Sequence, residues 1–203
     1  MDIYLIRHGE TDWNHMKKLQ GTTDIPLNAY GIELAEKTAE GLKDVPFDRI
    51  YTSPLIRARK TAEIIRRDRP IEIIETDGLK EISFGDYEGL CYLPDNYTIP
   101  KPGFRKFFDD PEHYDTPPHG ESLLHLRERT SSFVRSIMND PANENMTFLM
   151  AAHGAAIRGI LSGLQNLPLA EFWSGPVHKN CGVTKLHVEH GIFNIEFENR
   201  LYY

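Results

Sequence analysis

Two short apolar runs, far apart in the chain, each lead into the dipeptide histidine-glycine, and this pattern restricts the possible folds most. The first run, Ile3–Ile6, leads to His8, and the second, Met146–Ala152, leads to His153. Short and fully apolar runs are typical of strands that are buried in a parallel sheet. The carboxyl ends of parallel strands meet at one edge of the sheet, where the ligands of α/β proteins bind. The pattern therefore predicts that His8 and His153 lie together at a ligand-binding edge.

Between these runs, apolar residues at helical spacing alternate with further short strands. The spacing predicts helices over Ala29–Leu42, about Pro54–Arg67, Leu123–Ile137 and from Gly154 onward, and strands over Asp48–Thr52, Ile71–Ile73, Val183–Val188 and Ile192–Phe197. Ser53 before Pro54 is typical of an N-cap followed by a proline in the first turn. Such alternation predicts a three-layer α/β/α sandwich with a mostly parallel central sheet. The chain has 203 residues, and we expect residues 1–203 to form a single domain.

The segment from Cys91 to His119 differs from the rest of the chain. It contains six prolines and six aromatic residues, and only the part around Phe104–Phe108 suits a regular helix. A long irregular segment inside a compact domain is usually a lid, a binding loop or a disordered excursion. Because aromatic residues favour packing over disorder, we expect an inserted lid at about residues 91–119.

The charge balance and the cysteines exclude several classes of protein. The chain has 23 lysines and arginines against 30 acidic residues, which gives a net charge of −7 and disfavours a nucleic-acid or membrane partner. No apolar run approaches the roughly 18 residues that span a bilayer. Cys91 and Cys181 form no close pair, which is typical of reduced thiols in a cytoplasmic protein.

A few polar residues stand out as candidates for chemistry, although each has an ordinary structural explanation when it is taken alone. The guanidinium of Arg7 offers a planar fork of donors that suits phosphate oxygens. Arg57 falls near the start of a predicted helix, where backbone N–H groups favour anions, but a single helix arginine is usually a solvated one. Glu81 interrupts an apolar stretch, and by itself it would be a surface carboxylate.

Taken together and in order, these pieces resemble a known family. The matching segments are Leu5–Asn14, Gln20–Leu27, Thr52–Ala62, Glu81 with Phe84 and Gly85, Glu88 with Gly89, Gly120–Ser122 and Ala152–Gly154. They are similar to the signature of the histidine phosphatase superfamily, in its phosphoglycerate-mutase-like branch. One such segment would be weak support, whereas the ordered set covers nearly the whole chain.

The resemblance implies a role for each candidate residue. His8 would be the nucleophile and form a phosphohistidine, while Arg7, Arg57 and His153 would surround the phosphoryl group. Glu81 would protonate the leaving oxygen and then activate water, which requires a raised carboxyl pKa. The residues that match the family's phosphate pocket are Asn14, Gln20, Gly21 and the backbone of Gly154. The resemblance implies neither a metal nor another cofactor.

The reaction that this resemblance implies is the metal-independent hydrolysis of phosphomonoesters, of the histidine acid phosphatase type. We expect a small phosphorylated metabolite as the partner, such as a sugar phosphate or α-ribazole phosphate. The cofactor-dependent mutases carry an arginine directly after the catalytic glutamate, whereas this chain has Ile82. Two alternatives stay open, a phosphoglycerate mutase and a non-catalytic module that binds phosphorylated ligands. A metal-dependent hydrolase built on His8 and His153 is disfavoured because close-set ligand pairs are absent. The sequence leaves the oligomeric state open, a homodimer included.

Overall fold

One sheet of six strands runs through the protein, in the order β3-β2-β4-β1-β5-β6. The computed structural model describes residues 1–100 and 102–203. The strands are β1 (Asp2–Arg7), β2 (Arg49–Thr52), β3 (Ile73–Glu75), β4 (Thr147–Ala152), β5 (Val183–Glu189) and β6 (Ile192–Arg200). The first four strands pair in parallel, and β5 and β6 are added in antiparallel fashion beside β1. The sheet is therefore mostly parallel, as the sequence predicts.

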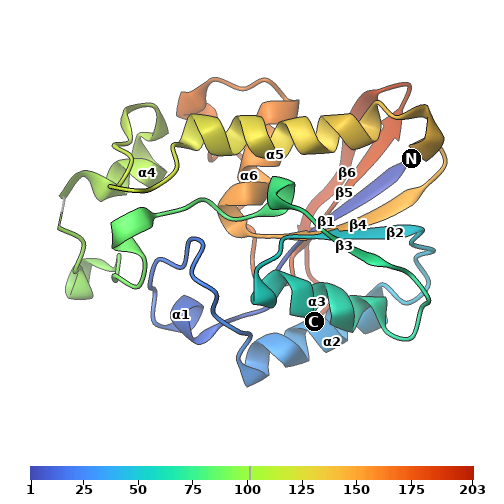
Figure 1. Ribbon diagram of the computed structural model, residues 1–203, viewed down its shortest axis with the longest axis horizontal. Helices are drawn as coiled ribbons and strands as arrows, with labels where there is room; N and C mark the ends of the chain where they lie inside the picture. The colour runs from blue at the N-terminus through green and yellow to red at the C-terminus, as the bar shows by residue number, and fades with distance from the viewer. Residues whose placement is uncertain (101) are drawn as a thin grey trace.

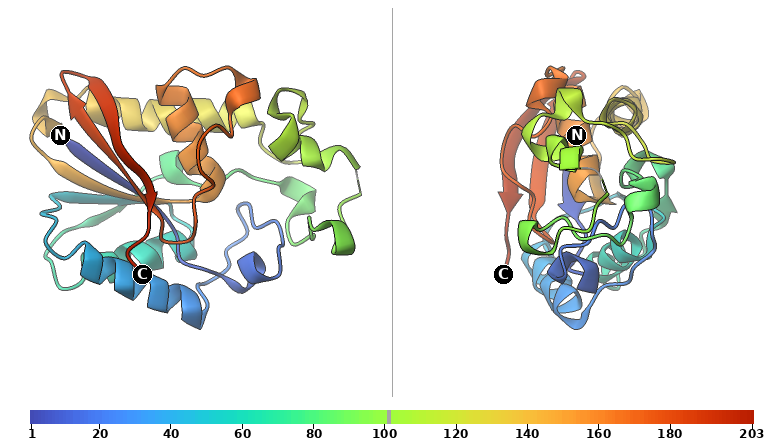
Figure 2. Two further views of the ribbon diagram at one scale, coloured as in Figure 1. Left: turned by 180° about the vertical axis from the view of Figure 1, so that it is seen from behind. Right: turned by 90° about the vertical axis from the view of Figure 1, so that its left-hand side faces the viewer.

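Helices cover both faces of this sheet and make the three predicted layers (Figure 1). The helices are α1 (Asp12–His15), α2 (Ala29–Gly41), α3 (Ile56–Arg66), α4 (Lys106–Asp109), α5 (Leu123–Met138) and α6 (Gly154–Leu164). The pair α2 and α3 lies on one face, and α5 and α6 lie on the other (Figure 2). Within the described residues, no helix is long and apolar enough to cross a membrane.

Strand β1 shows why the apolar runs have so few polar residues. Ile3 and Leu5 pack into the cluster that contains residues of α5 and α6, whereas Tyr4 and Ile6 pack into the cluster under α2 and α3. Because successive side chains of a strand point to opposite faces, a strand between two helical layers has to be apolar at every position. This burial fixes β1 and β4 side by side in the middle of the sheet.

The start of α3 differs from the sequence prediction. The helix begins at Ile56, two residues later than predicted, and Ser53 does not cap it. The Ser53 hydroxyl instead accepts from the backbone N–H of Leu55 and bonds to His153. The backbone N–H of Ile56 donates to a carboxylate oxygen of Asp24 at 2.7 Å. A side chain from a distant loop thus replaces the local cap, which local sequence cannot reveal.

The predicted insert is irregular, and it packs against the body of the protein. It contains short 3₁₀ turns and one helical turn, α4, which overlaps the stretch that suits a helix. Lys101 within it lies outside the described residues. Its apolar side chains, Phe104 and Phe107 among them, form a third cluster with Phe84 and Phe172. The insert lies beyond the carboxyl ends of the parallel strands, as Figure 2 shows. Its action as a lid stays a prediction.

Candidate active site

The two histidines that follow the central strands lie side by side. Arg7 at the end of β1 pairs in register with Ala152 at the end of β4, so the next residue of each strand is a histidine. The ring centroids of His8 and His153 are 5.1 Å apart. Only 3% of His8 and 0% of His153 is exposed. The parallel pairing of the strands is therefore what joins two residues so distant in sequence.

A pocket of about 190 Å³ opens beside His8. All the residues that the sequence assigns to the site, apart from His153, line it: Arg7, His8, Asn14, Gln20, Gly21, Arg57, Glu81 and Gly154. His153 does not line this pocket, and its Nε2 is 2.8 Å from the Ser53 hydroxyl. We group Arg7, His8 and Arg57 from this lining with the neighbouring His153 under the name phosphate pocket, after the role that the sequence predicts for them.

The surroundings of His8 fix both its charge and its tautomer. Its Nδ1 is 2.6 Å from the backbone carbonyl of Gly9, which can only accept, so Nδ1 carries the proton and Nε2 the lone pair. Burial holds the pKa of His8 well below its usual value, and the positive charges of Arg57 and Arg7 act in the same direction. A neutral His8 with an unprotonated Nε2 is the form that can act as a nucleophile.

Arg57 is fully buried and is held by backbone carbonyls rather than by a carboxylate. Its two amino groups donate to the carbonyl oxygens of Gly21 and Thr23, at 2.7 and 2.8 Å. Burial lowers its pKa to about 10, with the opposing charge of Glu81 acting to raise it, so the side chain stays charged at neutral pH. Arg7 is held in a similar way, since one amino group donates to the carbonyl oxygen of His178.

Several buried polar atoms of this site have no partner among the described residues. They include Nε of Arg7, Nε of Arg57 and Nδ1 of His153, together with Oε1 of Gln20. Leaving such an atom unsatisfied costs about 1–3 kcal/mol, so most buried polar groups are paired. The unpaired Nε–H groups of the two arginines are charged donors, so they indicate a site that suits an anion, whereas the Gln20 oxygen can only accept.

The carboxyl of Glu81 reaches the N-terminus of α6. One oxygen accepts from the backbone N–H of Ile82 and of Ala156, at 3.1 and 2.9 Å, and the other from that of Ala155 at 3.3 Å. Burial raises the pKa of Glu81, while Arg57 and these backbone donors act to lower it. The carboxyl therefore meets the requirement of an acid that holds its proton at higher pH than an ordinary glutamate.

Glu88 braces the loop that carries Gln20 and Gly21. Its carboxylate accepts from the backbone N–H groups of Thr22 and Thr23, at 2.8 Å each, and from their hydroxyls. Gly21 has a φ of +52°, and a side chain there would collide with this carboxylate. By holding this loop, Glu88 positions the carbonyl groups that bind Arg57. The sequence analysis identified Glu88 only as a match to the family and assigned it no role.

The sequence analysis missed one segment of the site altogether. Residues 165–182 carry no apolar period and none of the family segments. Yet Asn180 donates to the carbonyl oxygen of His8 at 3.0 Å and to Oδ1 of Asn14 at 3.3 Å. With that oxygen engaged by Asn180 and Thr11, the amide nitrogen of Asn14 is the group left for a ligand.

Aromatic side chains form the outer side of the pocket. Tyr92, Phe107 and Phe108 come from the insert, and Trp173 follows α6 in sequence. The rings of Phe108 and Trp173 are 5.6 Å apart, and Phe107 lies 5.1 Å from Trp173. Phe108 is 43% exposed, whereas only 2% of Phe107 is. We call these four residues the aromatic wall.

Within the described residues, one group of potential metal ligands meets the distance criterion, and it lies away from the pocket. It consists of Asp2, His187 and Glu196. The ammonium of Lys185 bonds to both carboxylates at 2.9 Å, so their charges are already compensated. Asp2 begins β1, at the opposite end of the sheet from His8.

The fold and this site together define a class of protein. The chain belongs to the histidine phosphatase superfamily (branch 1), whose pattern it matches over residues 3–200. The predicted family is therefore confirmed.

Three proteins illustrate the similarity. Over 160 residues the chain is 41% identical to PhoE of Bacillus subtilis (strain 168), described as an uncharacterized phosphatase, covering 79% of this chain and 75% of that one. Over 168 residues it is 33% identical to GpmB of Proteus mirabilis (strain HI4320), described as a probable phosphoglycerate mutase, covering 83% and 76%. The crystal structure of phosphoserine phosphatase from Entamoeba histolytica in complex with 3-phosphoglyceric acid matches with a TM-score of 0.83 at 33% identity, covering 98% and 96%.

Proposed function

We propose that this protein hydrolyses small phosphomonoesters through a phosphohistidine at His8. The observation that carries the proposal is the state of that side chain. The Gly9 carbonyl holds its Nδ1 proton, burial and two arginines keep the ring neutral, and Nε2 keeps its lone pair beside the pocket. A covalent intermediate divides one difficult displacement into two easier ones.

In the first step, Nε2 of His8 attacks phosphorus, and the bond from phosphorus to the ester oxygen breaks. The proton of the Glu81 carboxyl passes to that oxygen, so the leaving group departs as an alcohol. In the second step, the Glu81 carboxylate takes a proton from water as the water oxygen attacks phosphorus. The phosphorus–nitrogen bond then breaks, and its electron pair returns to Nε2.

The charge that builds on the phosphoryl oxygens is met by Arg7 and Arg57. Both guanidinium groups are positioned by backbone carbonyls before substrate arrives, so little reorganisation is needed in the transition state. Their unpartnered Nε–H groups, with the first backbone N–H of α6 at Gly154, are the donors we assign to the phosphate. With this charge supplied by the chain, the proposed reaction uses no metal.

The aromatic wall supports a leaving group with a flat apolar surface. Phe108 and Trp173 line the pocket with their ring centroids 5.6 Å apart, and Lys18 is a further cation in its lining. Of the two substrate types that we expect from the sequence, the α-ribazole phosphate type fits this wall better than a sugar phosphate, because its base can stack on a ring.

Two observations support hydrolysis over mutase activity. The residue after Glu81 is Ile82, a fully buried apolar side chain. This position therefore offers no cation to bind phosphoglycerate. The relative from Bacillus subtilis and the Entamoeba histolytica structure are described as phosphatases. Because another relative is described as a probable phosphoglycerate mutase, mutase activity is the alternative to test.

The two cysteines bear on where the protein works. Cys91 and Cys181 are both free thiols. Since unpaired cysteines are usual in reducing compartments, they support a cytoplasmic location.

The test is phosphate release from a panel of phosphomonoesters in the presence of EDTA, with His8→Ala as the control. The panel contains α-ribazole phosphate, a sugar phosphate, phosphoserine and 3-phosphoglycerate, whose isomerisation is followed in parallel. We expect EDTA-resistant release that the substitution abolishes. Isomerisation without release would favour the mutase, and ligand binding with neither reaction would favour a non-catalytic module.

A further inference from the structure

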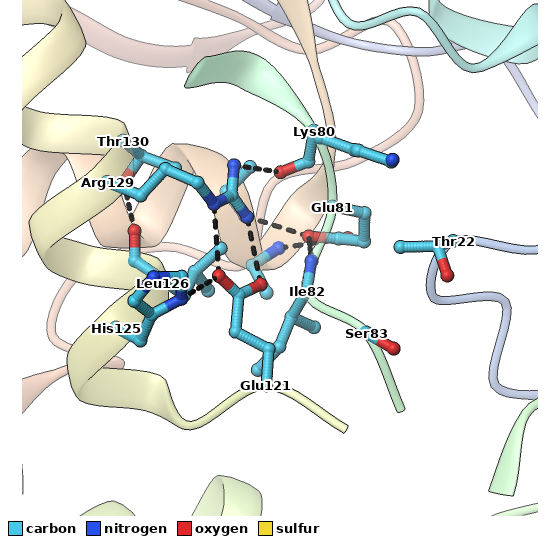
Figure 3. A network of polar contacts seen from close by, with 12 residues as sticks. Thr22, Lys80, Glu81, Ile82, Ser83, Glu121, His125, Leu126, Arg129 and Thr130 are labelled. Atoms are coloured by element: carbon cyan, nitrogen blue, oxygen red, sulfur yellow. Dashed lines mark hydrogen bonds and ion pairs between the residues drawn. The ribbon is translucent and has the colours of Figure 1, made fainter. Parts of the chain in front are cut away.

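A cluster of polar side chains lies near Glu81 (Figure 3) and outside the lining of the pocket beside His8. Glu121 precedes α5, and His125 and Arg129 lie one helical turn apart within it. We call these three residues the rear clamp. None of them lines the pocket beside His8, so they have no contact with a substrate bound there.

Arg129 is the centre of the rear clamp. Its Nε and one amino group donate to the two carboxylate oxygens of Glu121, at 3.0 and 2.9 Å. Its other amino group donates to the carbonyl oxygens of Asp77 and Lys80. His125 bonds to the same carboxylate at 2.6 Å. The planar guanidinium thus joins a fixed carboxylate on one side to the backbone before Glu81 on the other.

The backbone of Glu121 also holds the chain after Glu81. The backbone N–H of Glu121 donates to the carbonyl oxygen of Ser83 at 2.8 Å. Lys80 and Ser83 flank the acid, so one partner of the ion pair fixes the chain before it and the other fixes the chain after it. Glu81 therefore lies on a short span that is tied at one end to Arg129 of α5 and at the other end to Glu121, just before that helix.

The polar ties lie on the side of this span that faces a hollow. Behind Glu81 is a second hollow of about 430 Å³, whose lining includes Glu81, Ser83, Glu121 and Arg129. Leu79 and Ile82 anchor the span in the apolar clusters, whereas on the side of the hollow the backbone is held by the polar ties. The ion pair is shielded, since the side chains of Arg129 and Glu121 are 20% and 12% exposed, so solvent weakens it less than it weakens a surface pair.

We propose that Arg129 and Glu121 are positioning residues that hold Glu81 at the leaving oxygen. The inference rests on the proposed role of Glu81 as the general acid. A proton donor works only within hydrogen-bond reach of the atom it protonates, and a misplacement of about 1 Å can cost on the order of 100-fold in rate. Losing the clamp should therefore harm the protonation step and leave the attack by His8 intact.

The experiment compares two esters whose leaving groups differ in their need for a proton. p-Nitrophenolate leaves without protonation, whereas the alkoxide of glycerol phosphate does not. For Arg129→Met we expect kcat/KM, which reports the first step and not the later attack of water, to fall at least about tenfold more on glycerol phosphate than on p-nitrophenyl phosphate. The matched control is Arg127→Met on the same helix, whose guanidinium donates to the carbonyl oxygen of Leu167. It should change the two rates equally.

A second comparison separates positioning from general damage to the fold. In a Glu81→Gln background, Arg129→Met should lower either rate by less than about twofold, because the group that it positions can no longer donate a proton. Thermal melting of each variant checks its fold, and Glu121→Gln replaces Arg129→Met if the latter does not fold. Equal losses on both esters, or full additivity with Glu81→Gln, would overturn the proposal.

The proposed function has its own readout in the same experiment. If the wild-type protein hydrolyses neither ester in a manner that depends on His8, the phosphatase function fails, and the positioning role falls with it. If the wild type hydrolyses both and the clamp variant loses both rates equally, only the positioning role fails.

Discussion

The phosphate pocket and the aromatic wall face the same cavity, yet they are built in different ways. Side chains of the phosphate pocket are held by directional bonds to the backbone, as when Arg57 donates to the carbonyls of Gly21 and Thr23. Side chains of the wall are held by ring contacts, such as those of Phe107 with Phe108 and Trp173. Directional bonds fix an atom in one place, whereas ring contacts allow several packings.

We infer from this difference that the two regions have separate roles in binding a substrate. A phosphoryl group is the same in every phosphomonoester, so the part that binds it can be rigid. Leaving groups vary, and a wall of rings that includes the exposed Phe108 can accept different shapes. Changes in the phosphate pocket should therefore lower the rate on every substrate, and changes in the wall should alter which substrate is preferred.

The largest effect expected of any single change belongs to the phosphate pocket. His8→Ala removes the nucleophile, and we expect phosphate release to fall more than about 100-fold on every ester, while the variant still unfolds in a single cooperative transition. The measurement is initial-rate kinetics on the panel beside a thermal melt. Residual activity above about a hundredth of the wild-type rate, on any ester, would remove His8 from the role of nucleophile.

The second largest effect depends on the leaving group and on pH. Glu81→Gln should lower kcat/KM, which reports the first step, about 100- to 10,000-fold on alkyl esters and much less on p-nitrophenyl phosphate. Burial raises the pKa of Glu81, and the acid acts only when protonated, so the wild-type rate on alkyl esters falls as pH rises through that pKa. His8 acts only when neutral, and since burial lowers its pKa, the rate rises as pH rises through a value below 6.5.

The pH profiles of kcat/KM for the wild type and for Glu81→Gln test these two directions of pH dependence. The falling limb should be missing in Glu81→Gln, and the rising limb should remain. A falling limb that survives the substitution would assign it to another group.

The difference between directional bonds and ring contacts also explains how well the sequence predicts each region. His8 and His153 could be placed together because parallel strands bring their ends to one edge whatever the loops do. The place of Arg57 near a helix start only made it a candidate, and the family resemblance assigned it to the site. Its burial and its carbonyl partners could not be predicted, because they depend on a loop braced by Glu88, far away in the chain.

The wall was less predictable. Composition indicates that the rings of the insert pack together, but ring contacts follow no sequence period. Trp173 comes from a segment without any signal, and Asn180 in the same segment reaches His8 and Asn14. Asp24 at the start of α3 is a further case, since a cap supplied from 32 residues away replaces the local serine.

Phe107→Ala tests whether the wall holds the insert in place. Only 2% of Phe107 is exposed, and its ring contacts those of Phe84, Phe104 and Trp173. Removing a buried ring of this kind costs about 3–5 kcal/mol of unfolding free energy. We expect a loss of that size in urea unfolding, while kcat on p-nitrophenyl phosphate falls less than about threefold, since His8 needs no contact with the insert. A much larger fall in kcat on p-nitrophenyl phosphate would show that the aromatic wall and the phosphate pocket are not independent.

Phe108→Ala should have the smallest effect, and it is the sharpest test of the wall as a specificity surface. Phe108 is 43% exposed and lies next to Phe107 in sequence, so it serves as the matched partner of the buried ring. The unfolding free energy should change by less than about 1 kcal/mol. The loss of one stacking contact, worth about 0.5–1.5 kcal/mol, should raise KM for naphthyl phosphate about two- to twelvefold and leave KM for glycerol phosphate unchanged. Equal changes in both KM values would mean that the wall only fills space, and that the leaving group is recognised by Lys18 or by the backbone of the pocket instead.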